Sequence, residues 1–261
     1  MILELKDIHL SFSGDRGASR ILDGLGMKVA RGKVTALIGG NGAGKTTLFN
    51  IISGFQKGYG GEIHFDGRSI GGTAPHRVSE MGIGRLFQGK PLLPELTLLE
   101  NMKLASTDTT GEVPFSCFFK RVKLKVREKA KEARAVSILD QLFGGGNKYV
   151  PMLHHPGLAF SGGEQRLLSL AGLFMGEHSL LLLDEPTAGV NPKYIESIKG
   201  IIRRMVDDGK KTVLLIEHNM PFIGGVADSC AFLEKGRIDI HEATEKVLSN
   251  PKVRNSYLGI R

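Results

Sequence analysis

Residues 34–47 read VTALIGGNGAGKTT, and this stretch decides the fold. The run 34–38 has the composition of a fully buried strand, and the run 46–52 predicts a helix directly after the loop. Between them, residues 39–46 fit the pattern G-x-x-x-x-G-K-[ST], whose glycines let backbone N–H groups and the positive helix end face phosphate oxygens. A glycine-rich turn with a chance lysine would not explain the flanking strand and helix. The stretch therefore predicts a binding loop for ATP or GTP.

Each part of this loop has an expected task. Lys45 supplies a cation for the β and γ phosphates, and the Thr46 hydroxyl is placed to ligate Mg²⁺. The positions expected to contact the nucleotide are Gly39, Asn41, Gly42, Ala43, Gly44, Lys45, Thr46 and Thr47.

Length and composition are those of a globular chain that does not enter the membrane. The 261 residues are 41% hydrophobic and 24% charged, which is ordinary for a soluble domain. No apolar run approaches the roughly 20 residues that span a bilayer, and acidic residues interrupt the opening segment where a signal peptide would be apolar. Cys117 and Cys230 fit neither a disulfide framework nor a metal-ligand spacing. We expect a cytoplasmic protein.

The net charge of +8 raises the question of an acidic partner. Residues 120–134 carry eight Lys or Arg and two Glu, in a pattern that predicts a helix. Such a helix can bind nucleic acid or an anionic membrane surface, but most charged helical faces are simply solvated, and we favour that interpretation.

The order of the remaining segments predicts an α/β fold. Buried strands are expected at 34–38, 180–184 and 212–216, further strands at 2–12, 62–65, 83–88, 229–234 and 237–240, and a polar loop at 14–20. Helices alternate with the buried strands, which implies a mixed, largely parallel sheet with right-handed crossovers. Residues 90–160 are mainly helical and are interpreted as an insertion into the core. The predicted architecture is a single domain, residues 1–261, with its core at 1–89 and 161–261.

Two carboxylates end the strand at 180–184. Asp184 is suited to hold Mg²⁺ together with Thr46, and Glu185 is suited to orient or deprotonate an attacking water. Two ordinary strand-end acids are the alternative, but this pair supplies what the phosphate loop still lacked.

The motifs beyond the phosphate loop resemble those of ATP-binding subunits of ABC transporters. They are SGGEQR at 161–166, LLLLDEPTAGVNP at 180–192 and EH at 217–218. The resemblance covers essentially the whole chain and implies a P-loop NTPase (RecA-like) fold with an antiparallel β portion and an inserted helical subdomain, an ATPase activity, and ATP and Mg²⁺ as ligands.

The resemblance also assigns further site residues. Gln88 matches the glutamine that senses Mg²⁺ and the γ-phosphate, and His218 matches the switch histidine that contacts the γ-phosphate. Ser161, Gly162 and Gly163 match the signature that caps the ATP of a partner subunit. Phe12 resembles the aromatic residue that stacks on adenine, with packing in the core as its alternative.

The partners implied by the family are a second ATP-binding subunit in a head-to-tail homo- or heterodimer, integral membrane permease subunits, and a substrate-binding protein. The chain would lie on the inner face of the cell membrane through the permease, and no nucleic acid is expected. A few positions depart from the usual motifs, among them Gly40, Phe160, Glu164, Asn191 and Gly172. None of them removes a metal ligand or the base.

The motifs TAGVNP at 187–192 and EHNM at 217–220, and the segment 250–259, are most similar to the branched-chain (hydrophobic) amino acid uptake subfamily. The lipopolysaccharide-export ATPase is a near relative and stays open as an alternative. A soluble ABC ATPase acting on nucleic acid or ribosomes is disfavoured because the insertion is short and the chain has one cassette. A P-loop kinase would not need the SGGE motif.

Overall fold

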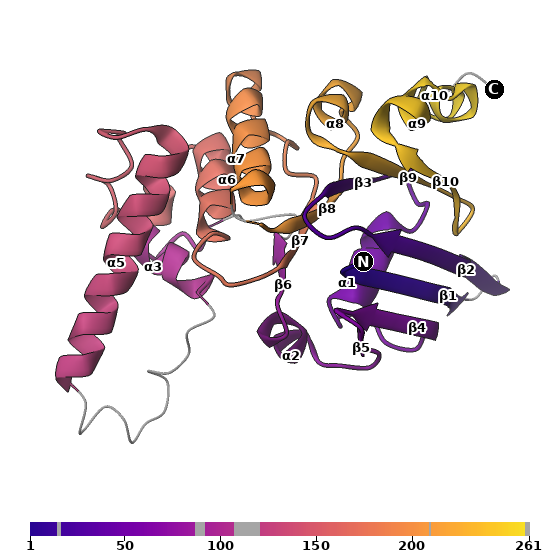
Figure 1. Ribbon diagram of the computed structural model, residues 1–261, viewed down its shortest axis with the longest axis horizontal. Coiled ribbons are helices and arrows are strands. Elements are labelled where there is room, and N and C mark those ends of the chain that lie inside the picture. Colours follow the sequence, from indigo (N-terminus) through magenta and orange to yellow (C-terminus); the bar gives the residue numbers. More distant parts are fainter. Residues whose placement is uncertain (15–16, 87–91, 107–120, 209, 259–261) are drawn as a thin grey trace. The chain divides into compact units, whose positions relative to one another are not determined.

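Largely apolar strands of five residues each lie at the centre of a six-stranded sheet (Figure 1). This computed structural model describes residues 1–14, 17–86, 92–106, 121–208 and 210–258. The described residues divide into two compact units: unit 1 comprises 1–85, 179–187 and 202–261, and unit 2 comprises 86–178 and 188–201.

Unit 1 contains both sheets. Its strands are β1 (Leu3–Gly14), β2 (Gly17–Val29), β3 (Val34–Ile38), β4 (Gly60–Phe65), β5 (Arg68–Ser69), β6 (Ile83–Leu86, whose last residue falls in unit 2), β7 (Leu180–Asp184), β8 (Thr212–Ile216), β9 (Ser229–Glu234) and β10 (Arg237–Ala243). Its helices are α1 (Lys45–Ile52), α2 (Pro75–Glu80), α8 (Met220–Val226), α9 (Thr244–Ser249) and α10 (Pro251–Leu258).

The larger sheet has the order β10-β9-β3-β8-β7-β6. Strands β9, β3, β8 and β7 are parallel to one another, and β10 is antiparallel to β9. The register aligns Leu37 of β3 with Ile216 of β8, and Ile216 with Asp184 of β7. Because adjacent parallel strands end at the same edge, the segments that follow these three residues leave the sheet side by side.

The second sheet is antiparallel, with the order β2-β1-β4-β5. Helix α1 lies between the two sheets, since Leu48, Phe49 and Ile52 share one buried cluster with residues of both. The cluster includes Leu3, Ile8 and Leu25 of the antiparallel sheet and Leu182, Leu214 and Leu233 of the larger one. The helix that begins at the phosphate loop is therefore fixed on two sides by the core.

Unit 2 is helical. It contains α3 (Leu98–Leu104), α5 (Arg121–Phe143), η1 (Gly157–Ala159), α6 (Gly162–Gly172) and η2 (Pro192–Tyr194), and α7 (Ile195–Asp207) is divided between the units after Ile201. The cap predicted for α3 is present: the backbone N–H of Glu100 donates to Thr97 Oγ1 and the backbone N–H of Thr97 donates to the Glu100 carboxylate. Gly144, with a φ of 88°, directly follows α5 and ends it as predicted.

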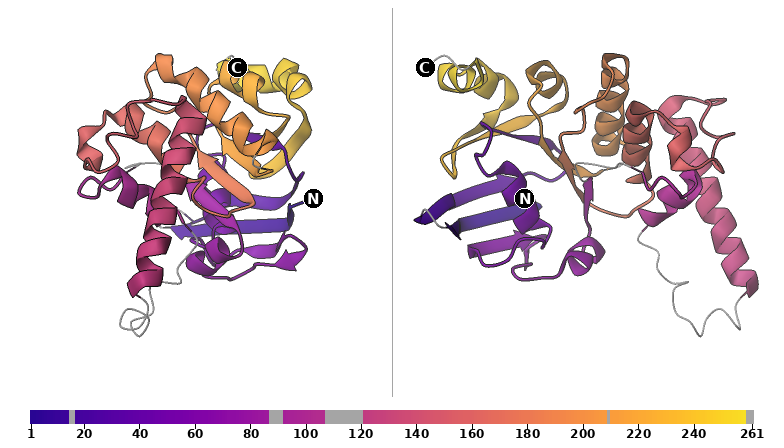
Figure 2. Two further views of the ribbon diagram at one scale, coloured as in Figure 1. Left: turned by 60° about the vertical axis from the view of Figure 1, so that its left-hand side comes forward. Right: turned by 180° about the vertical axis from the view of Figure 1, so that it is seen from behind.

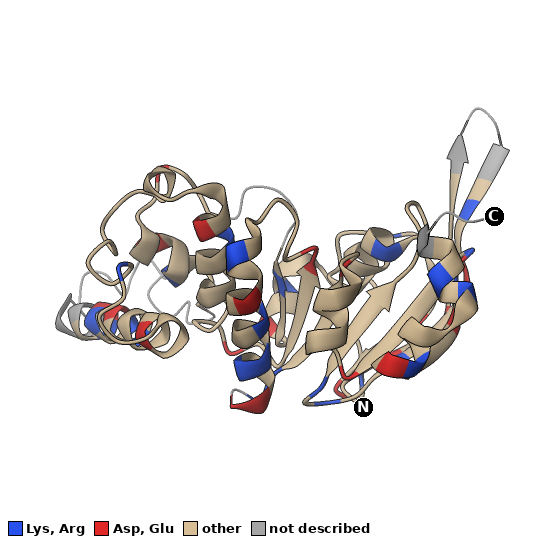
Figure 3. Ribbon diagram, turned by 90° about the horizontal axis from the view of Figure 1, so that it is seen from above, with Lys and Arg blue, Asp and Glu red and all other residues tan. Residues whose placement is uncertain are grey.

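Side chains 126–130 of the basic helix α5 are all exposed, and Ala135, further along the helix, is buried. Figures 1 and 2 show the N-terminal part of α5 extending beyond α3, and Figure 3 shows charged residues along the helix. The two acids pair with other parts of unit 2, Glu128 with Lys103 and Glu132 with His154. These features agree with the interpretation of the helix as a solvated face.

Most predicted elements are confirmed, but one expected loop is wrong and several elements had not been predicted. The expected loop at 14–20 is wrong, because Ser11 pairs with Arg20 and Gly14 with Gly17, so the two strands continue almost to the turn. Strands β2 and β5 and helices α2 and α8 had not been predicted. Gln88, Cys117 and Lys120 lie outside the described residues. Among the helices of the described ranges, none is long and apolar enough to cross a bilayer.

Candidate nucleotide site

The phosphate loop connects β3 to α1 in unit 1. Gly44 precedes the helix with a φ of 103°, and a side chain there would meet Leu22 of β2 at 2.9 Å. A Cβ atom at Gly39 would lie 2.3 Å from the backbone oxygen of Leu233 in β9. The loop therefore needs glycine at Gly39 because the backbone of β9 leaves no room for a side chain, and at Gly44 because its positive φ is strained for other residues.

Lys45 is folded back over the loop. Its Nζ atom donates to the backbone oxygens of Gly39 at 2.7 Å and Gly40 at 3.0 Å. Burial lowers the pKa of the Lys45 ammonium, whereas the negative charges of Glu185 and Asp184 act in the opposite direction and raise it. The structure thus brings the predicted phosphate-binding lysine and the two predicted carboxylates into one electrostatic site.

The two carboxylates differ in environment. The Asp184 side chain is 1% exposed, at the end of β7, while that of Glu185 is 25% exposed. Glu185 has a φ of 48°, which is uncommon for a residue with a side chain, and its backbone N–H donates to the oxygen of Ile216 at 2.9 Å. Its carboxylate Oε1 lies 3.3 Å from Nε2 of His218. The strand-end acid and the histidine predicted for γ-phosphate contact are therefore in direct contact.

Two residues that sequence reasoning missed organise this edge of the sheet. Arg85 of β6 donates to Asn50 and Ser53 at 2.8 Å each and lies 3.4 Å from Asp184, and burial lowers the pKa of its guanidinium. Glu217 is 3% exposed and accepts hydrogen bonds from the backbone N–H groups of Thr187 and His218. Both residues could have been noticed in the sequence, because Arg85 is a charged residue within an otherwise apolar run and Glu217 directly follows one.

Phe12 lies on the antiparallel sheet. It pairs with Ser19 of β2 and its side chain is 46% exposed. The alternative of packing in the core is therefore wrong, and an exposed ring is available for stacking.

The signature residues lie in unit 2, at the start of α6. Ser161 donates from its backbone N–H and its hydroxyl to the Glu164 carboxylate at 2.9 and 2.7 Å. Lys148 pairs with the same carboxylate. Burial raises the pKa of Glu164, but the hydrogen bonds from Lys148 and Ser161 outweigh burial and lower the pKa of Glu164 to about 2. Ser161 and Gly162 are exposed, so the N-terminal end of α6 is open to an anionic ligand.

Two departures from the usual motifs have a local explanation. At a third, Gly40, nothing lies within 4 Å of a Cβ built on the backbone, so space does not require glycine there. Phe160 is buried beside Tyr149, with ring centroids 6.3 Å apart. Asn191 accepts from the backbone N–H of Lys193 and caps η2.

Comparison with known proteins identifies similar sequences and structures. Residues 22–188 match the family described as ABC transporter. The chain is 31% identical to the high-affinity branched-chain amino acid transport ATP-binding protein BraF of Pseudomonas aeruginosa, over 99% of this chain and 98% of that protein. It is 34% identical to the probable branched-chain amino acid transport ATP-binding protein LivG of Archaeoglobus fulgidus, over 99% and 95%. A crystal structure of the ADP conformation of an ATP-binding cassette superposes with a TM-score of 0.79 at 30% identity, covering 99% of this chain and 98% of that one.

Proposed function

The chain belongs to the ABC transporter family, whose ATP-binding cassettes hydrolyse ATP to power transport, and we propose that it drives uptake of branched-chain or other hydrophobic amino acids. The names of BraF and LivG, which match nearly the whole chain, support this substrate class. The chain itself would supply the ATPase, and separate permease subunits would bind and move the amino acid.

The observation that carries the proposal is the meeting of Lys45, Glu185 and His218 at one edge of the parallel sheet. In this proposal Lys45 binds the β and γ phosphates, and the backbone N–H groups of residues 39–47 surround them. Glu185 orients and deprotonates the attacking water, and His218, 3.3 Å from Glu185, contacts the γ-phosphate. Phe12 would stack on adenine.

The donor set at this edge fits a magnesium ion that is held partly by the nucleotide. In the described part of the chain there is no group of three His, Cys, Asp or Glu residues that could hold a metal. The Asp184 carboxylate and the Thr46 hydroxyl are hard oxygen donors, and Mg²⁺ commonly takes one or two protein ligands together with phosphate oxygens. We propose these two residues, with Gln88, as the protein ligands. Bound Mg²⁺ would supply charge stabilisation on the transferring phosphoryl group.

The same proposal includes a head-to-tail dimer. A single cassette has one phosphate loop and one signature, so Ser161, Gly162 and Gly163 would cap the ATP of a second subunit through the exposed end of α6.

Unit 2 also presents exposed apolar side chains that are suited to a protein partner. Leu93 is 50% exposed and Leu158 is 67% exposed. Their segments are joined by a hydrogen bond from the Leu158 N–H to the Pro94 oxygen. We assign this surface to subunit contacts.

Capture of the assembled complex tests the proposal. A tagged Glu185→Gln variant would be incubated with ATP in detergent-solubilised native membranes, and the co-purifying proteins identified. Lys45→Ala, at an ATP concentration that saturates only Glu185→Gln, is the matched variant with weakened ATP binding. We expect multi-spanning permease subunits and an amino-acid-binding protein with the first variant only. Recovery of ribosomal or nucleic-acid proteins in their place would overturn the transport function while leaving the ATPase intact, and a sugar-binding protein would overturn the substrate class alone.

A further inference from the structure

The Glu217 carboxylate joins two segments that leave neighbouring strands. Its Oε1 atom accepts from the backbone N–H of Thr187 at 3.0 Å and from the Thr187 hydroxyl. Its Oε2 atom accepts from the backbone N–H of His218 at 2.6 Å and of Asn219 at 3.1 Å. Only 3% of Glu217 is exposed and all four bonds are partly buried, which strengthens charge-assisted hydrogen bonds relative to solvent-exposed ones.

The two joined segments carry the residues proposed for hydrolysis. Thr187 lies two positions after Glu185, and His218 directly follows Glu217. Strands β7 and β8 align Asp184 with Ile216, and the backbone N–H of Glu185 still donates to the Ile216 oxygen. Past this bond the Glu217 carboxylate joins the two segments, and the Glu185–His218 contact of 3.3 Å lies beside it.

On these observations, and resting on the function proposed above, we infer that Glu217 is a positioning residue that sets the spacing between Glu185 and His218 without touching the nucleotide itself. A glutamate suits this task because an ionised carboxylate only accepts, and its two oxygens offer about four acceptor sites for four donors. Glutamine has nearly the same shape, but its NH₂ group would face two N–H or O–H donors and could accept from neither. Glu217→Gln therefore removes the two hydrogen bonds to one of the two segments with little change in side-chain volume.

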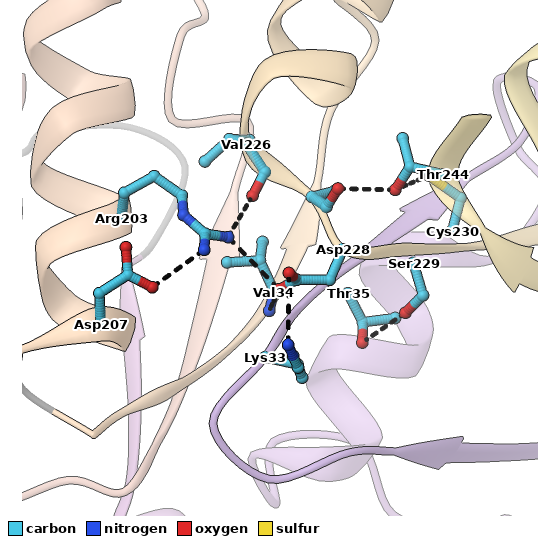
Figure 4. A network of polar contacts seen from close by, with 11 residues as sticks. Lys33, Val34, Thr35, Arg203, Asp207, Val226, Asp228, Ser229, Cys230 and Thr244 are labelled. Atoms are coloured by element: carbon cyan, nitrogen blue, oxygen red, sulfur yellow. Dashed lines mark hydrogen bonds and ion pairs between the residues drawn. The ribbon is translucent and has the colours of Figure 1, made fainter.

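A second carboxylate that binds a backbone N–H group, the partly buried Asp228, provides the matched control (Figure 4). Asp228 accepts from the backbone N–H of Val34 at 2.7 Å. Val34 begins β3, so this bond lies at the end of the strand opposite the phosphate loop. The guanidinium of Arg203 lies 3.4 Å from the Asp228 carboxylate and also donates to the Val226 oxygen. Asp228→Asn likewise changes a carboxylate that holds the backbone of unit 1, but it lies away from Glu185 and His218. The ATP hydrolysis of Asp228→Asn therefore shows the effect of losing a structural carboxylate that does not contact the proposed hydrolytic residues.

The experiment compares steady-state ATP hydrolysis, ATP affinity and amide hydrogen exchange in the purified wild-type chain and the two variants. For Glu217→Gln we expect kcat to fall roughly 10- to 100-fold, as for other residues that orient a reacting group, with ATP affinity nearly unchanged. Exchange at Thr187, His218 and Asn219 should accelerate, while the phosphate loop stays protected. Asp228→Asn should keep its kcat.

Two outcomes would overturn the inference: a folded Glu217→Gln chain with wild-type kcat, or an equal loss of kcat in Asp228→Asn. If Glu217→Gln does not fold, Thr187→Val removes only the hydroxyl donor and should lower kcat several-fold, and an unchanged kcat there counts equally against the inference. An inactive wild-type chain would instead contradict the proposed ATPase role, so the two failures are distinguishable.

Discussion

The guanidinium of Arg85 lies 3.4 Å from the carboxylate of Asp184, and the two side chains are 6% and 1% exposed. Taking one partner from a buried ion pair leaves a charge without its compensation, which costs about 3–5 kcal/mol. We therefore expect Arg85→Met to lower the free energy of unfolding, measured by urea titration, by about 3 kcal/mol. Adding Asp184→Asn removes the remaining charge and should recover a substantial part of the loss. Additive effects of the two changes would contradict a direct coupling.

Glu185→Gln should separate ATP binding from hydrolysis. The amide keeps the size of the side chain but cannot accept a proton, so we expect kcat to fall about 10²- to 10⁴-fold, with ATP retained in a closed dimer. Phosphate release and light scattering with ATP measure the two effects. Glu245→Gln, at an exposed position of α9, is the control and should hydrolyse ATP normally. Full turnover by Glu185→Gln would rule out its role as the base.

Lys45→Ala should weaken ATP binding. The variant loses a buried cation and its two contacts to loop oxygens, and a hydrogen bond from a charged group corresponds to roughly 10- to 100-fold in affinity. Isothermal titration with ATP measures the change. Lys33→Ala removes an exposed lysine just before β3 and should bind ATP as the wild type does. Equal affinities of the two variants would count against the phosphate-loop assignment.

Gly39→Ala and Gly40→Ala should differ although the residues are adjacent. A Cβ atom at position 39 would lie 2.3 Å from the Leu233 oxygen, so the loop must shift, at a cost of about 1–3 kcal/mol, and ATP affinity should fall with it. At position 40 nothing lies within 4 Å. Thermal unfolding with and without ATP measures both effects, and a stable, ATP-binding Gly39→Ala protein would contradict the close approach of β9.

Glu164 should make stability depend on pH in the acid range. Its folded pKa of about 2 lies below the ordinary value of 4.5, so the stabilisation is complete above 4.5 and is lost as the pH falls towards 2. Because Lys148 is 62% exposed, solvent screening reduces the contribution to on the order of 1–2 kcal/mol. Urea unfolding at neutral and acid pH should show a smaller pH dependence of stability in Glu164→Gln than in the wild type, by about this contribution. The control Glu196→Gln, in an exposed pair with Lys199, should behave as the wild type.

The elements that could be predicted from the sequence are those whose signals are local. Strands β3, β7 and β8 are uninterrupted apolar runs, and the cap of α3 is encoded within four residues. The phosphate loop and the acids Asp184 and Glu185 follow the same logic, because each stands directly after a predicted strand. The roles proposed for them remain predictions until the variants are measured.

What could not be predicted depends on contacts between distant parts of the chain. Arg85 looks like a surface residue until β6 is placed beside β7, which brings it to Asp184, far along the sequence. The turn expected at 14–20 looked polar, but pairing in the antiparallel sheet extends the strands through most of it. Local composition is a poor guide where cross-strand pairing decides the structure.

The alignment of Leu37, Ile216 and Asp184 across three parallel strands limits how the chain can change in length. Each residue along a strand advances the chain by about 3.3 Å and reverses the face on which side chains lie. Deleting one residue within β8 would therefore move His218 away from Glu185 by about that distance, even if every other residue kept its identity. Insertions in the solvent-exposed turn at Asp66–Gly67 carry no such penalty. We expect length variation among relatives to concentrate in such turns and to be absent from the three strands that end at the nucleotide site.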